Sequence, residues 1–305
     1  MKAVFVDASA ALGDIVQRLT RSTDPATVIN RDADVRPEAL AEIIGDAEIA
    51  IIDHTEFSTA IAARCPALRH VVFLGTGARS YMSPEELAER GIAVHIIKGY
   101  GDTAVAECAI ALMWAAAKGL AVMDRGMRQG QWLRTEGMQL TAKTLGLIGF
   151  GGIAAEVARM ATGIGMTVLA WNRNAKSHPG VTFTDLDTVL AQSHVVSLHL
   201  LLTDETRGFL SATRIAAMRP GVLLINTARG ALVDEAAMVA ALRSGQIGHA
   251  GLDVFTTEPL PADHPLTGLA NVTLSAHSAF RTPEASDNLI EAALKHCRRI
   301  AATQV

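Results

Sequence analysis

Short apolar runs alternate with alanine-rich stretches along the whole chain, and this alternation limits the fold more than any other feature. The first apolar runs are AVFV (3–6), AEIAIID (47–53), HVVFLG (70–75) and IAVHII (92–97). Helical patterns such as ALGDIVQRL (11–19) and PEELAERG (84–91) separate them, and Ser83 and Pro84 are predicted as N-cap and first residue of the second helix. Strands that alternate with helices are typical of parallel β-sheets covered by helices, so we predict an α/β fold.

The same alternation starts again after residue 143, which predicts a second α/β domain. Its predicted strands are 144–148, 167–171, 195–200, 222–226, 248–253 and 271–275, and its predicted helices are 153–164, 185–192, 211–218 and 234–243. Residues 103–128 form a long helical pattern interrupted by Gly119, interpreted as one or two helices that cross between the domains. The helical pattern at 283–302 has no sheet of its own, so we expect it to return to the first domain. The boundary between the domains lies near residue 99.

Composition excludes several classes of protein. Half of the 305 residues are hydrophobic and 19% are charged, as in a compact globular protein. The net charge of −4 and a pI near 6.2 give no basic surface for nucleic acid or an anionic membrane. The longest apolar run, at 108–117, is too short to span a bilayer, and the N-terminus reads as a strand and not as a secretory signal. We therefore expect a cytoplasmic protein.

The three cysteines encode no local site. Cys65, Cys108 and Cys297 are far apart in the sequence and form no C-x-x-C motif. We therefore predict neither a disulfide framework nor a zinc site, and no other metal site is proposed. Reduced, buried thiols are the expected state.

A glycine loop points to nucleotide binding. In TLGLIGFGGIAAEVARM (144–160), the pattern Gly149-x-Gly151-x-x-Ala154 follows a predicted strand and precedes a predicted helix. In this setting the first glycine allows a tight turn, the second lets the backbone approach a pyrophosphate, and the third position needs a small residue. The N–H groups of Gly152, Ile153 and Ala154, together with the helix dipole, are expected to bind the phosphates.

Four further stretches carry a resemblance to a known family. They are VVFLGTGARSYM (71–82), DTAVAECAIAL (102–112), INTARGALVDEAAMVAALRSGQIGHAGLDVFTTEPLP (225–261) and NVTLSAHSAF (271–280). Together with the glycine loop, they resemble the D-isomer-specific 2-hydroxyacid dehydrogenases. The resemblance implies two Rossmann-like or flavodoxin-like domains, with residues 99–280 binding NAD(P) and inserted into a discontinuous substrate (catalytic) domain, 1–98 with 281–305. It also implies a substrate cleft and a homodimer.

The resemblance implies three catalytic residues: Arg229 in TARG, Glu258 in TEPLP and His277 in SAHS. Reduction of a 2-oxo acid places negative charge on the carbonyl oxygen, which needs a proton donor and a fixed cation. Histidine beside a carboxylate can donate near neutral pH, and arginine can bind a substrate carboxylate with its planar fork. Taken singly, Arg229 can close a loop, Glu258 can be a turn residue and His277 can be a buried histidine bonded to backbone.

The remaining site residues also follow from the resemblance. Cofactor contacts are implied for Thr103, Thr203, Thr227, Ala228 and Asp253, the last to the nicotinamide carboxamide; helix capping is an equally good explanation for Thr103. The loop Gly75-Thr76-Gly77 is expected to bind the substrate carboxylate through backbone N–H groups, which small residues leave accessible.

Several positions depart from the family pattern. Arg79 and Met82 stand where acidic residues are usual, and Arg79 is either a solvated surface charge, which we favour, or an additional anchor for an anionic substrate group. Leu201 replaces a proline that follows the LH pair, which is expected to reshape the loop over the nicotinamide ribose. Gly152 replaces a polar side chain, so phosphate binding depends more on backbone. His199 in SLHLLLTDET is interpreted as structural.

The stretch WNRN (171–174) bears on cofactor choice. An acidic residue at the end of this strand would accept hydrogen bonds from the ribose hydroxyls and select NAD. Here Asn172 and Asn174 can donate hydrogen bonds and Arg173 can pair with a 2′-phosphate, so we predict a preference for NADP, with NAD also possible. The alternative is that Arg173 points to solvent or stacks on adenine and both cofactors bind.

The leading functional prediction is an NAD(P)-dependent reductase of small 2-oxo acids, with glyoxylate or hydroxypyruvate as substrate. Oxidation of 3-phosphoglycerate is an alternative that Arg79 would favour. A formate dehydrogenase fits less well, because LGTG and SAHS resemble the hydroxyacid branch. A cofactor-sensing binding protein of the same superfamily is the alternative from a different class.

Overall fold

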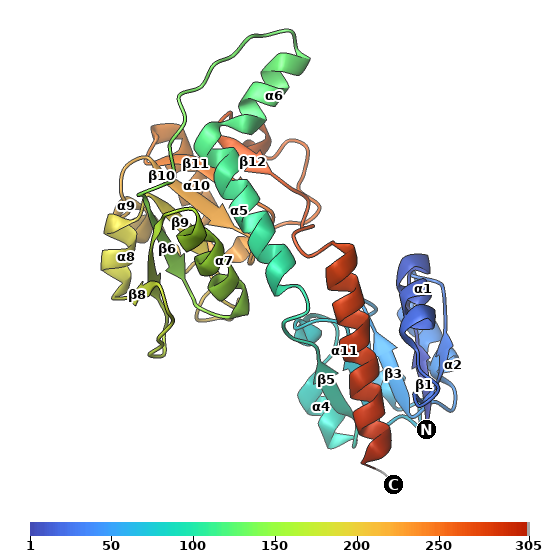
Figure 1. Ribbon diagram of the computed structural model, residues 1–305. Coiled ribbons are helices and arrows are strands. Elements are labelled where there is room, and N and C mark those ends of the chain that lie inside the picture. The colour runs from blue at the N-terminus through green and yellow to red at the C-terminus, as the bar shows by residue number, and fades with distance from the viewer. Residues whose placement is uncertain (304–305) are drawn as a thin grey trace. The chain divides into compact units, whose positions relative to one another are not determined.

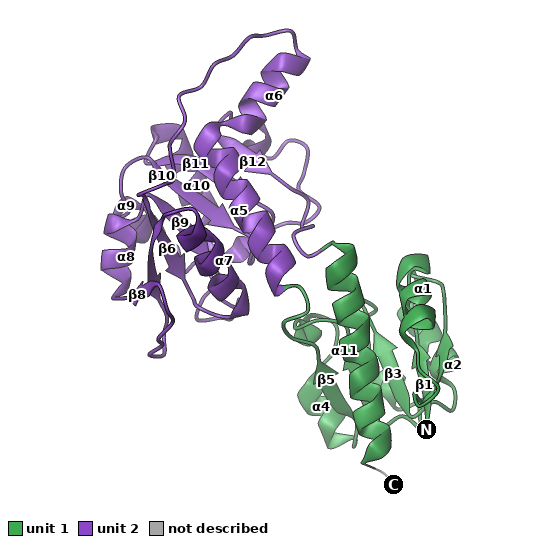
Figure 2. Cartoon of the chain, in the orientation of Figure 1, with its two compact units in different colours: residues 1–101, 281–305 green, residues 102–280 purple. Residues whose placement is uncertain are grey.

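The computed structural model describes residues 1–303, which form two compact units (Figures 1 and 2). Unit 1 comprises Met1–Gly101 and the chain from Arg281 onward, and unit 2 comprises Asp102–Phe280. Unit 1 extends to Gly101 and not to residue 98, because Tyr100 still accepts a hydrogen bond at its carbonyl oxygen from the Asn288 side chain, at 3.3 Å.

Unit 1 contains a five-stranded parallel sheet in the order β2-β1-β3-β4-β5. Its strands are β1 (Lys2–Phe5), β2 (Ala26–Ile29), β3 (Ile49–Ile52), β4 (His70–Phe73) and β5 (Ala93–Ile96). Its helices are α1 (Ala10–Leu19), α2 (Leu40–Ile44), α3 (Thr59–Ala62), α4 (Pro84–Glu89) and α11 (Pro283–Ala302), with 3-10 turns at Pro37–Ala39 and Ala78–Ser80. This strand order is the flavodoxin-like one, and it reverses between β1 and β3.

Helix α11 returns to unit 1, as the sequence predicted. Helices α1 and α11 bury apolar side chains against one face of the sheet, whereas α2, α3 and α4 cover the other face. Arg298 of α11 pairs with the buried carboxylate of Asp24 and, at 3.0 Å, with Glu291. The C-terminal helix is therefore fixed to the N-terminal part of the chain by both apolar packing and charge.

Unit 2 contains a seven-stranded parallel sheet in the order β12-β11-β10-β9-β6-β7-β8. Its strands are β6 (Thr144–Ile148), β7 (Thr167–Trp171), β8 (Val181–Phe183), β9 (Val195–Leu198), β10 (Val222–Asn226), β11 (Ile247–Leu252) and β12 (Val272–Leu274). Its helices are α5 (Asp102–Lys118), α6 (Leu120–Arg128), α7 (Gly152–Gly163), α8 (Leu186–Gln192), α9 (Ala212–Ala216) and α10 (Glu235–Ser244), with 3-10 turns at Gly230–Leu232 and Pro265–Gly268. Helices α5 and α7 pack on one face, and α8, α9 and α10 on the other. The strand order reverses between β6 and β9.

The long helical pattern at 103–128 forms two helices, both in unit 2 and not crossing between units as predicted. Gly119 has φ +63°, a left-handed conformation that glycine adopts without strain, and α5 and α6 are bent by 68° there. In residues 1–303 no single helix is long and apolar enough to cross a membrane; only the bent pair meets the criteria of length and composition.

The structure adds two strands that the sequence pattern did not predict, β2 and β8. Each lies at an edge of its sheet and is only partly buried, so its side chains lack the apolar run of a central strand. Ser83 is the N-cap residue of α4 and Pro84 its first residue, as predicted, although the Ser83 side chain makes no capping hydrogen bond.

Candidate active site

His277 and Glu258 form a hydrogen-bonded pair in unit 2. The two atoms, His277 Nδ1 and Glu258 Oε2, are 2.6 Å apart, and Glu258 Oε1 accepts a hydrogen bond of 2.8 Å from the backbone N–H of Phe255. The side chains are 40% and 34% exposed, so the pair is accessible. A carboxylate on one ring nitrogen fixes the imidazole and leaves Nε2 available for proton transfer.

Asp253 holds the segment that carries His277. Its fully buried carboxylate accepts hydrogen bonds from the Ser275 hydroxyl (2.6 Å) and from the N–H groups of Ser278 (3.0 Å) and Ala279 (2.9 Å). The His277 N–H donates to the Asp253 carbonyl oxygen at 2.8 Å. His277 has φ +48°, a conformation that costs about 1–3 kcal/mol and persists where surrounding contacts impose it. The contacts of Asp253 thus position the histidine; its predicted contact with nicotinamide remains a prediction.

Arg229 lies in a turn that a buried asparagine fixes. Asn226, the last residue of β10, donates from its side chain to the Arg229 carbonyl oxygen at 2.9 Å and accepts from the Ala228 N–H at 3.0 Å. The Arg229 side chain is exposed and donates to the Ala228 carbonyl oxygen at 2.6 Å. The next residue, Gly230, lies so close to Phe255 and Thr256 that a Cβ at position 230 would overlap their backbone.

This close approach connects the three predicted catalytic residues within unit 2. Gly230 brings the Arg229 turn against the backbone of Phe255, and Phe255 anchors Glu258, which binds His277. Asn226 and Gly230 were not identified from the sequence. The glycine that follows Arg229 was the only available signal, because the approach of segment 255–256 is a tertiary contact.

The glycine loop lies at the carboxyl end of β6, where the strand order of unit 2 reverses. Gly149 has φ +87°, and a Cβ there would be 2.7 Å from the His199 carbonyl oxygen. Helix α7 begins at Gly152 with Gly151 as N-cap residue, and Ala154 is completely buried. Gly152 and Gly151 are exposed, and Ile153 is partly exposed. The start of this twelve-residue helix therefore offers free N–H groups of the kind that bind phosphate.

The carboxylate of Asp102 lies against Gly152. A Cβ on Gly152 would overlap the carboxylate of Asp102, the first residue of α5. Burial, and then the charge of Glu156, raises the pKa of the Asp102 carboxyl. A side chain at position 152 would require the Asp102 carboxylate to shift; with glycine there, any phosphate contact of residue 152 comes from its backbone.

The asparagine pair at the end of β7 is engaged within the protein. Asn172 accepts from the Phe150 N–H at 3.1 Å and donates to the Asn174 carbonyl oxygen at 2.9 Å. Arg173 forms an exposed ion pair with Glu205 at 3.1 Å. Lys176, which the sequence analysis did not single out, donates to the Phe150 carbonyl oxygen at 2.6 Å. Two cationic side chains, Arg173 and Lys176, therefore lie beside the glycine loop or the turn that follows β7.

Thr227 carries the clearest local sign of a missing partner. Its hydroxyl is the only buried side-chain polar atom without a hydrogen-bond partner in the part of the chain that the structure describes. Leaving such a group unpaired costs about 1–3 kcal/mol, so a polar ligand atom is expected there. Three other predicted cofactor contacts are Ala228, next to Thr227, Thr203, which is exposed in the loop after β9, and Thr103. Thr103 is the second residue of α5 and therefore not its N-cap. The residues present thus fit a dinucleotide at this edge of the sheet.

The predicted substrate loop lies in unit 1, directly after β4. Gly75 is buried with φ +147°, and its carbonyl oxygen accepts from the Ile97 N–H at 3.0 Å. Thr76 is exposed, and the space around Gly77 is open, so packing within unit 1 does not require glycine there. Met82 is buried in the apolar core, which explains why an acid is absent from this position.

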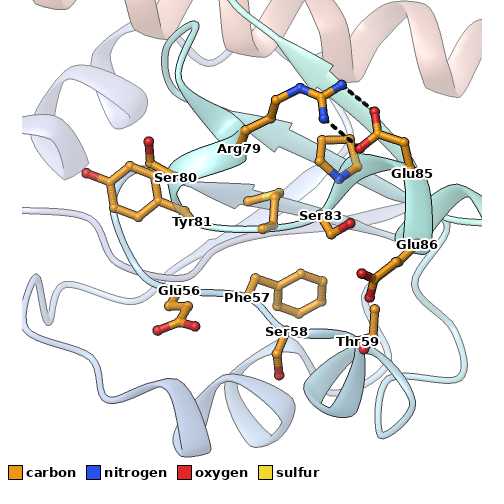
Figure 3. A pocket seen from close by; sticks show the side chains of 12 residues that line it. Glu56, Phe57, Ser58, Thr59, Arg79, Ser80, Tyr81, Ser83, Glu85 and Glu86 are labelled. Carbon is orange, nitrogen blue, oxygen red and sulfur yellow. Dashed lines mark hydrogen bonds and ion pairs between the residues drawn. The ribbon is translucent and has the colours of Figure 1, made fainter. Parts of the chain in front are cut away.

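Arg79 is held by an acidic neighbour. Its guanidinium makes two hydrogen bonds to the Glu85 carboxylate, one of them 2.8 Å long, and lines a pocket together with segments 56–59 and 80–86 (Figure 3). The hydrogen bond from Arg79 lowers the pKa of Glu85. Glu56 and Glu86 line the same pocket, so its carboxylates outnumber its single guanidinium. This arrangement agrees with a surface charge and disfavours an anchor for a second anionic group.

The interpretation of His199 as structural is supported by its contacts, whereas the prediction of buried thiols holds for two of the three cysteines. His199 bonds through Nε2 to the Ser197 hydroxyl at 2.9 Å, and burial lowers its pKa to about 4, as expected of a neutral structural histidine. Cys65 and Cys297 are buried, Cys108 is partly buried, and none of the three is in a disulfide. Burial raises the pKa of Cys108 to about 11, so the thiol is unreactive near neutral pH.

Unit 2 thus combines a glycine loop at a strand reversal, a histidine–carboxylate pair and an arginine turn that packs against segment 255–256, which are the parts expected of a dehydrogenase that uses a nicotinamide dinucleotide. Residues 110–279 match the family described as D-isomer specific 2-hydroxyacid dehydrogenase, NAD binding domain. The hydroxypyruvate reductase of Blautia hydrogenotrophica is 32% identical over 298 residues, which cover 94% of this chain and 88% of that protein. The chain therefore belongs to the D-isomer-specific 2-hydroxyacid dehydrogenase family, as its motifs predicted.

Solved structures are similar over nearly the whole chain. A glyoxylate reductase from Paecilomyes thermophila matches with a TM-score of 0.82 and 29% identity, covering 97% of this chain and 93% of that one. An acyclic imino acid reductase, Bsp5, in complex with NADPH and D-Arg matches with a TM-score of 0.80 and 27% identity, covering 96% and 94%. As a family member, this chain is an oxidoreductase that transfers a hydride between a nicotinamide cofactor and a 2-oxo or 2-hydroxy acid. The predictions of an enzyme and of the family are confirmed.

Proposed function

We propose that this enzyme reduces hydroxypyruvate and glyoxylate, with NADPH as its preferred cofactor. The observation that carries the proposal is the 2.6 Å hydrogen bond between Glu258 and His277, with Glu258 itself anchored by the Phe255 N–H. The similarity to a hydroxypyruvate reductase and to a glyoxylate reductase supports the choice of substrates.

Each catalytic side chain has a separate task in this proposal. When bound, the cofactor supplies the hydride that forms the new C–H bond at C2 of the 2-oxo acid. His277 donates its Nε2 proton to the carbonyl oxygen as negative charge develops there, and Glu258 stabilises the imidazolium before transfer. Arg229 binds the substrate carboxylate and stabilises the charge on the oxygen. In unit 1, the N–H groups of Gly75-Thr76-Gly77 keep their predicted role as donors to a substrate carboxylate.

A phosphorylated substrate is the weaker alternative. Arg79 was the residue that favoured 3-phosphoglycerate, but its guanidinium is bonded to Glu85, and Glu56 and Glu86 line the same pocket. A phosphate dianion would have to displace a carboxylate and approach two others, which costs electrostatic energy. We therefore propose small 2-oxo acids with an uncharged side chain as the substrate class.

The cofactor preference rests on charge at the end of β7. Arg173 and Lys176 supply two cations, and no acidic residue stands at Asn172 to accept from a 2′-hydroxyl. Glu205 pairs with Arg173 and would be exchanged for the 2′-phosphate. The similarity to an acyclic imino acid reductase that was solved in complex with NADPH supports the proposal.

We also propose a cytoplasmic homodimer. Leu120, Met127, Trp132 and Leu133, on α6 and the segment after it, are exposed apolar side chains gathered on one part of unit 2, and Trp132 is 76% exposed. Such gathered apolar surface is typical of interfaces between protein chains. Free cysteines support a reducing compartment.

Oxidation of NADPH and of NADH with a panel of 2-oxo acids tests the proposal. We expect turnover of hydroxypyruvate and glyoxylate, with a higher kcat/KM for NADPH. Binding of cofactor without turnover of any 2-oxo acid would contradict the assignment of an active reductase and favour a cofactor-sensing protein.

A further inference from the structure

A buried carboxylate lies where the sheet of unit 1 changes direction. Asp7 follows β1, and the strand order reverses between β1 and β3. The Asp7 side chain is completely buried and accepts hydrogen bonds of 2.9 Å from the N–H groups of Asp53, His54 and Thr55, and of 2.8 Å from the Thr55 hydroxyl. In open α/β sheets, ligands bind at the carboxyl ends of the strands beside such a reversal. Asp7 therefore fixes the backbone after β3 at a place suited to a ligand.

Two polar side chains project from this fixed segment. His54 Nδ1 lies 3.2 Å from Asp53 Oδ2, and the side chains of His54 and Asp53 are 46% and 30% exposed. The pair thus remains accessible although its backbone is held by a buried group. Asp53 is the partner of His54 Nδ1, and the His54 imidazole also hydrogen-bonds to the Ala33 backbone.

Charged groups of both signs act on the pKa values of Asp53 and His54. Burial, and then the charge of Asp7, raises the pKa of Asp53, while Arg281 acts in the opposite direction. Although burial acts to lower it, the pKa of His54 is raised by its hydrogen bond to Asp53 and by the charges of Asp53 and Asp7. The pair therefore offers carboxylate oxygens beside an imidazole as hydrogen-bonding groups. A second anionic substrate group would meet two carboxylates.

The pair adjoins the loop proposed to bind the substrate carboxylate. Strands β3 and β4 are parallel neighbours with Ile52 opposite Phe73, and the Leu74 N–H donates to the Ile52 carbonyl oxygen at 2.8 Å. Asp53 therefore lies beside Leu74, one residue before Gly75. Neighbouring strands are about 4.8 Å apart, a distance that a group on C3 of a carboxylate-anchored 2-oxo acid can bridge.

We propose that Asp53 and His54 form a polar subsite that binds the C3 hydroxyl group of the substrate and so favours hydroxypyruvate over pyruvate. A hydroxyl can donate to the Asp53 carboxylate, which His54 holds in place through its Nδ1. The methyl group of pyruvate would leave these polar atoms without a partner, which disfavours it. Glyoxylate has no C3 and would not engage the subsite. The inference rests on the proposed function, because it takes the Gly75–Gly77 loop as the carboxylate site.

The experiment compares kcat/KM for hydroxypyruvate, pyruvate and glyoxylate in the wild type, Asp53→Ala and His54→Ala. Asp46→Ala is the matched control, because Asp46 precedes β3 at the opposite end of the strand and its side chain is 76% exposed. Each subsite variant should lower kcat/KM for hydroxypyruvate by about 10- to 100-fold and change that for glyoxylate by less than about threefold. Asp46→Ala should change neither.

Retained turnover of glyoxylate also demonstrates that a variant is folded. If Asp53→Ala does not fold, His54→Ala provides the test, because His54 is exposed. The quantity compared is again the ratio of kcat/KM for hydroxypyruvate to kcat/KM for glyoxylate. If the ratio of kcat/KM for hydroxypyruvate to kcat/KM for glyoxylate is unchanged in the variants, the proposed subsite is overturned and the reductase assignment stays intact. A wild type that reduces no 2-oxo acid would overturn the proposed function itself and, with it, the subsite.

Discussion

Residues that are not themselves proposed to react determine the geometry around His277. Asp253 holds segment 275–279 through three hydrogen bonds, Asn226 holds the Arg229 turn, and Gly230 lets segment 255–256 approach that turn. Most of these contacts are made with backbone atoms; the exception is the hydrogen bond from the Ser275 hydroxyl to Asp253. Small changes at these positions should therefore move Arg229, Glu258 and His277 relative to one another.

Gly230→Ala tests this dependence. The added Cβ overlaps backbone atoms of Phe255 and Thr256, which cannot rotate away, so we expect destabilisation of about 1–3 kcal/mol and a fall in kcat. Thermal unfolding and steady-state kinetics measure both. Gly268→Ala is the control, because a Cβ there meets no atom within 4 Å. Equal stability and activity of the two variants would show that the close approach is not needed.

Arg173 tests the cofactor preference at the same scale. Removing its charge should raise the KM for NADPH about tenfold or more, with little change for NADH, because only NADPH carries the 2′-phosphate. Glu205→Gln should act in the opposite direction and lower the KM for NADPH, since it removes the competing carboxylate. Steady-state kinetics of both variants, with NADPH and with NADH, measures these opposite effects. Equal effects of Arg173→Ala on NADPH and NADH would refute the preference.

At the scale of helices and strands, most of the central elements could be predicted from the sequence, because buried strands form uninterrupted apolar runs. β6, β7 and β10 have the predicted bounds. The edge strands β2 and β8 are short and half exposed, and no apolar run marks them. The contact of Asp102 with Gly152, and that of Asp7 with the Asp53–His54 pair, join residues that are far apart in the sequence. No motif marks either contact. Such contacts can be identified only from the three-dimensional structure.

Packing of β4, β5 and α11 predicts a dependence of stability on pH. His70 Nδ1 and His95 Nε2 are 3.2 Å apart, and the ring of His296 on α11 lies 5.6 Å from that of His95. Burial, with the charges of His70, His296 and Arg299, lowers the pKa of His95 to about 4. Burial also lowers the pKa values of His70 and His296; Glu48 opposes the shift of His70, and Arg299 and Lys295 add to that of His296.

Because these folded-state pKa values lie below the unfolded value near 6.5, the unfolded chain binds more protons in this range. The contribution of the cluster to stability is therefore complete above pH 6.5 and is lost as the pH falls toward 4. Urea unfolding at pH 7 and pH 5 should show the loss, and His95→Gln should reduce it. An equal loss in the variant would mean that other groups, such as His199 and His249, account for the whole effect.

At the scale of the whole molecule, the chain leaves unit 1 after Gly101, builds unit 2 and returns at Arg281. The orphan helical pattern at 283–302 predicted this return, and the ion pair of Arg298 with Asp24 fixes α11 to the N-terminal part of unit 1. Unit 1 therefore cannot be complete without the last helix. The proposed homodimer belongs to the same scale, because it concerns a surface of unit 2 and not a site.

Trp132→Ser combined with Met127→Ser tests the dimer. Both side chains are more than half exposed, so their replacement should leave the fold of unit 2 intact while removing apolar area from the proposed interface. Sedimentation velocity should show a dimer for the wild type and a shift toward monomer for the double variant. A monomeric wild type, or an undisturbed dimer in the variant, would contradict this use of α6 and the segment after it.

The central claim is that His277, held by Glu258 and Asp253, donates the proton during reduction of a 2-oxo acid. The most direct measurement is the kcat of His277→Ala with hydroxypyruvate, together with the Kd for NADPH. We expect kcat to fall about 10²- to 10⁴-fold with little change in Kd, because the imidazole serves proton transfer and not cofactor binding. A kcat close to that of the wild type would contradict the account.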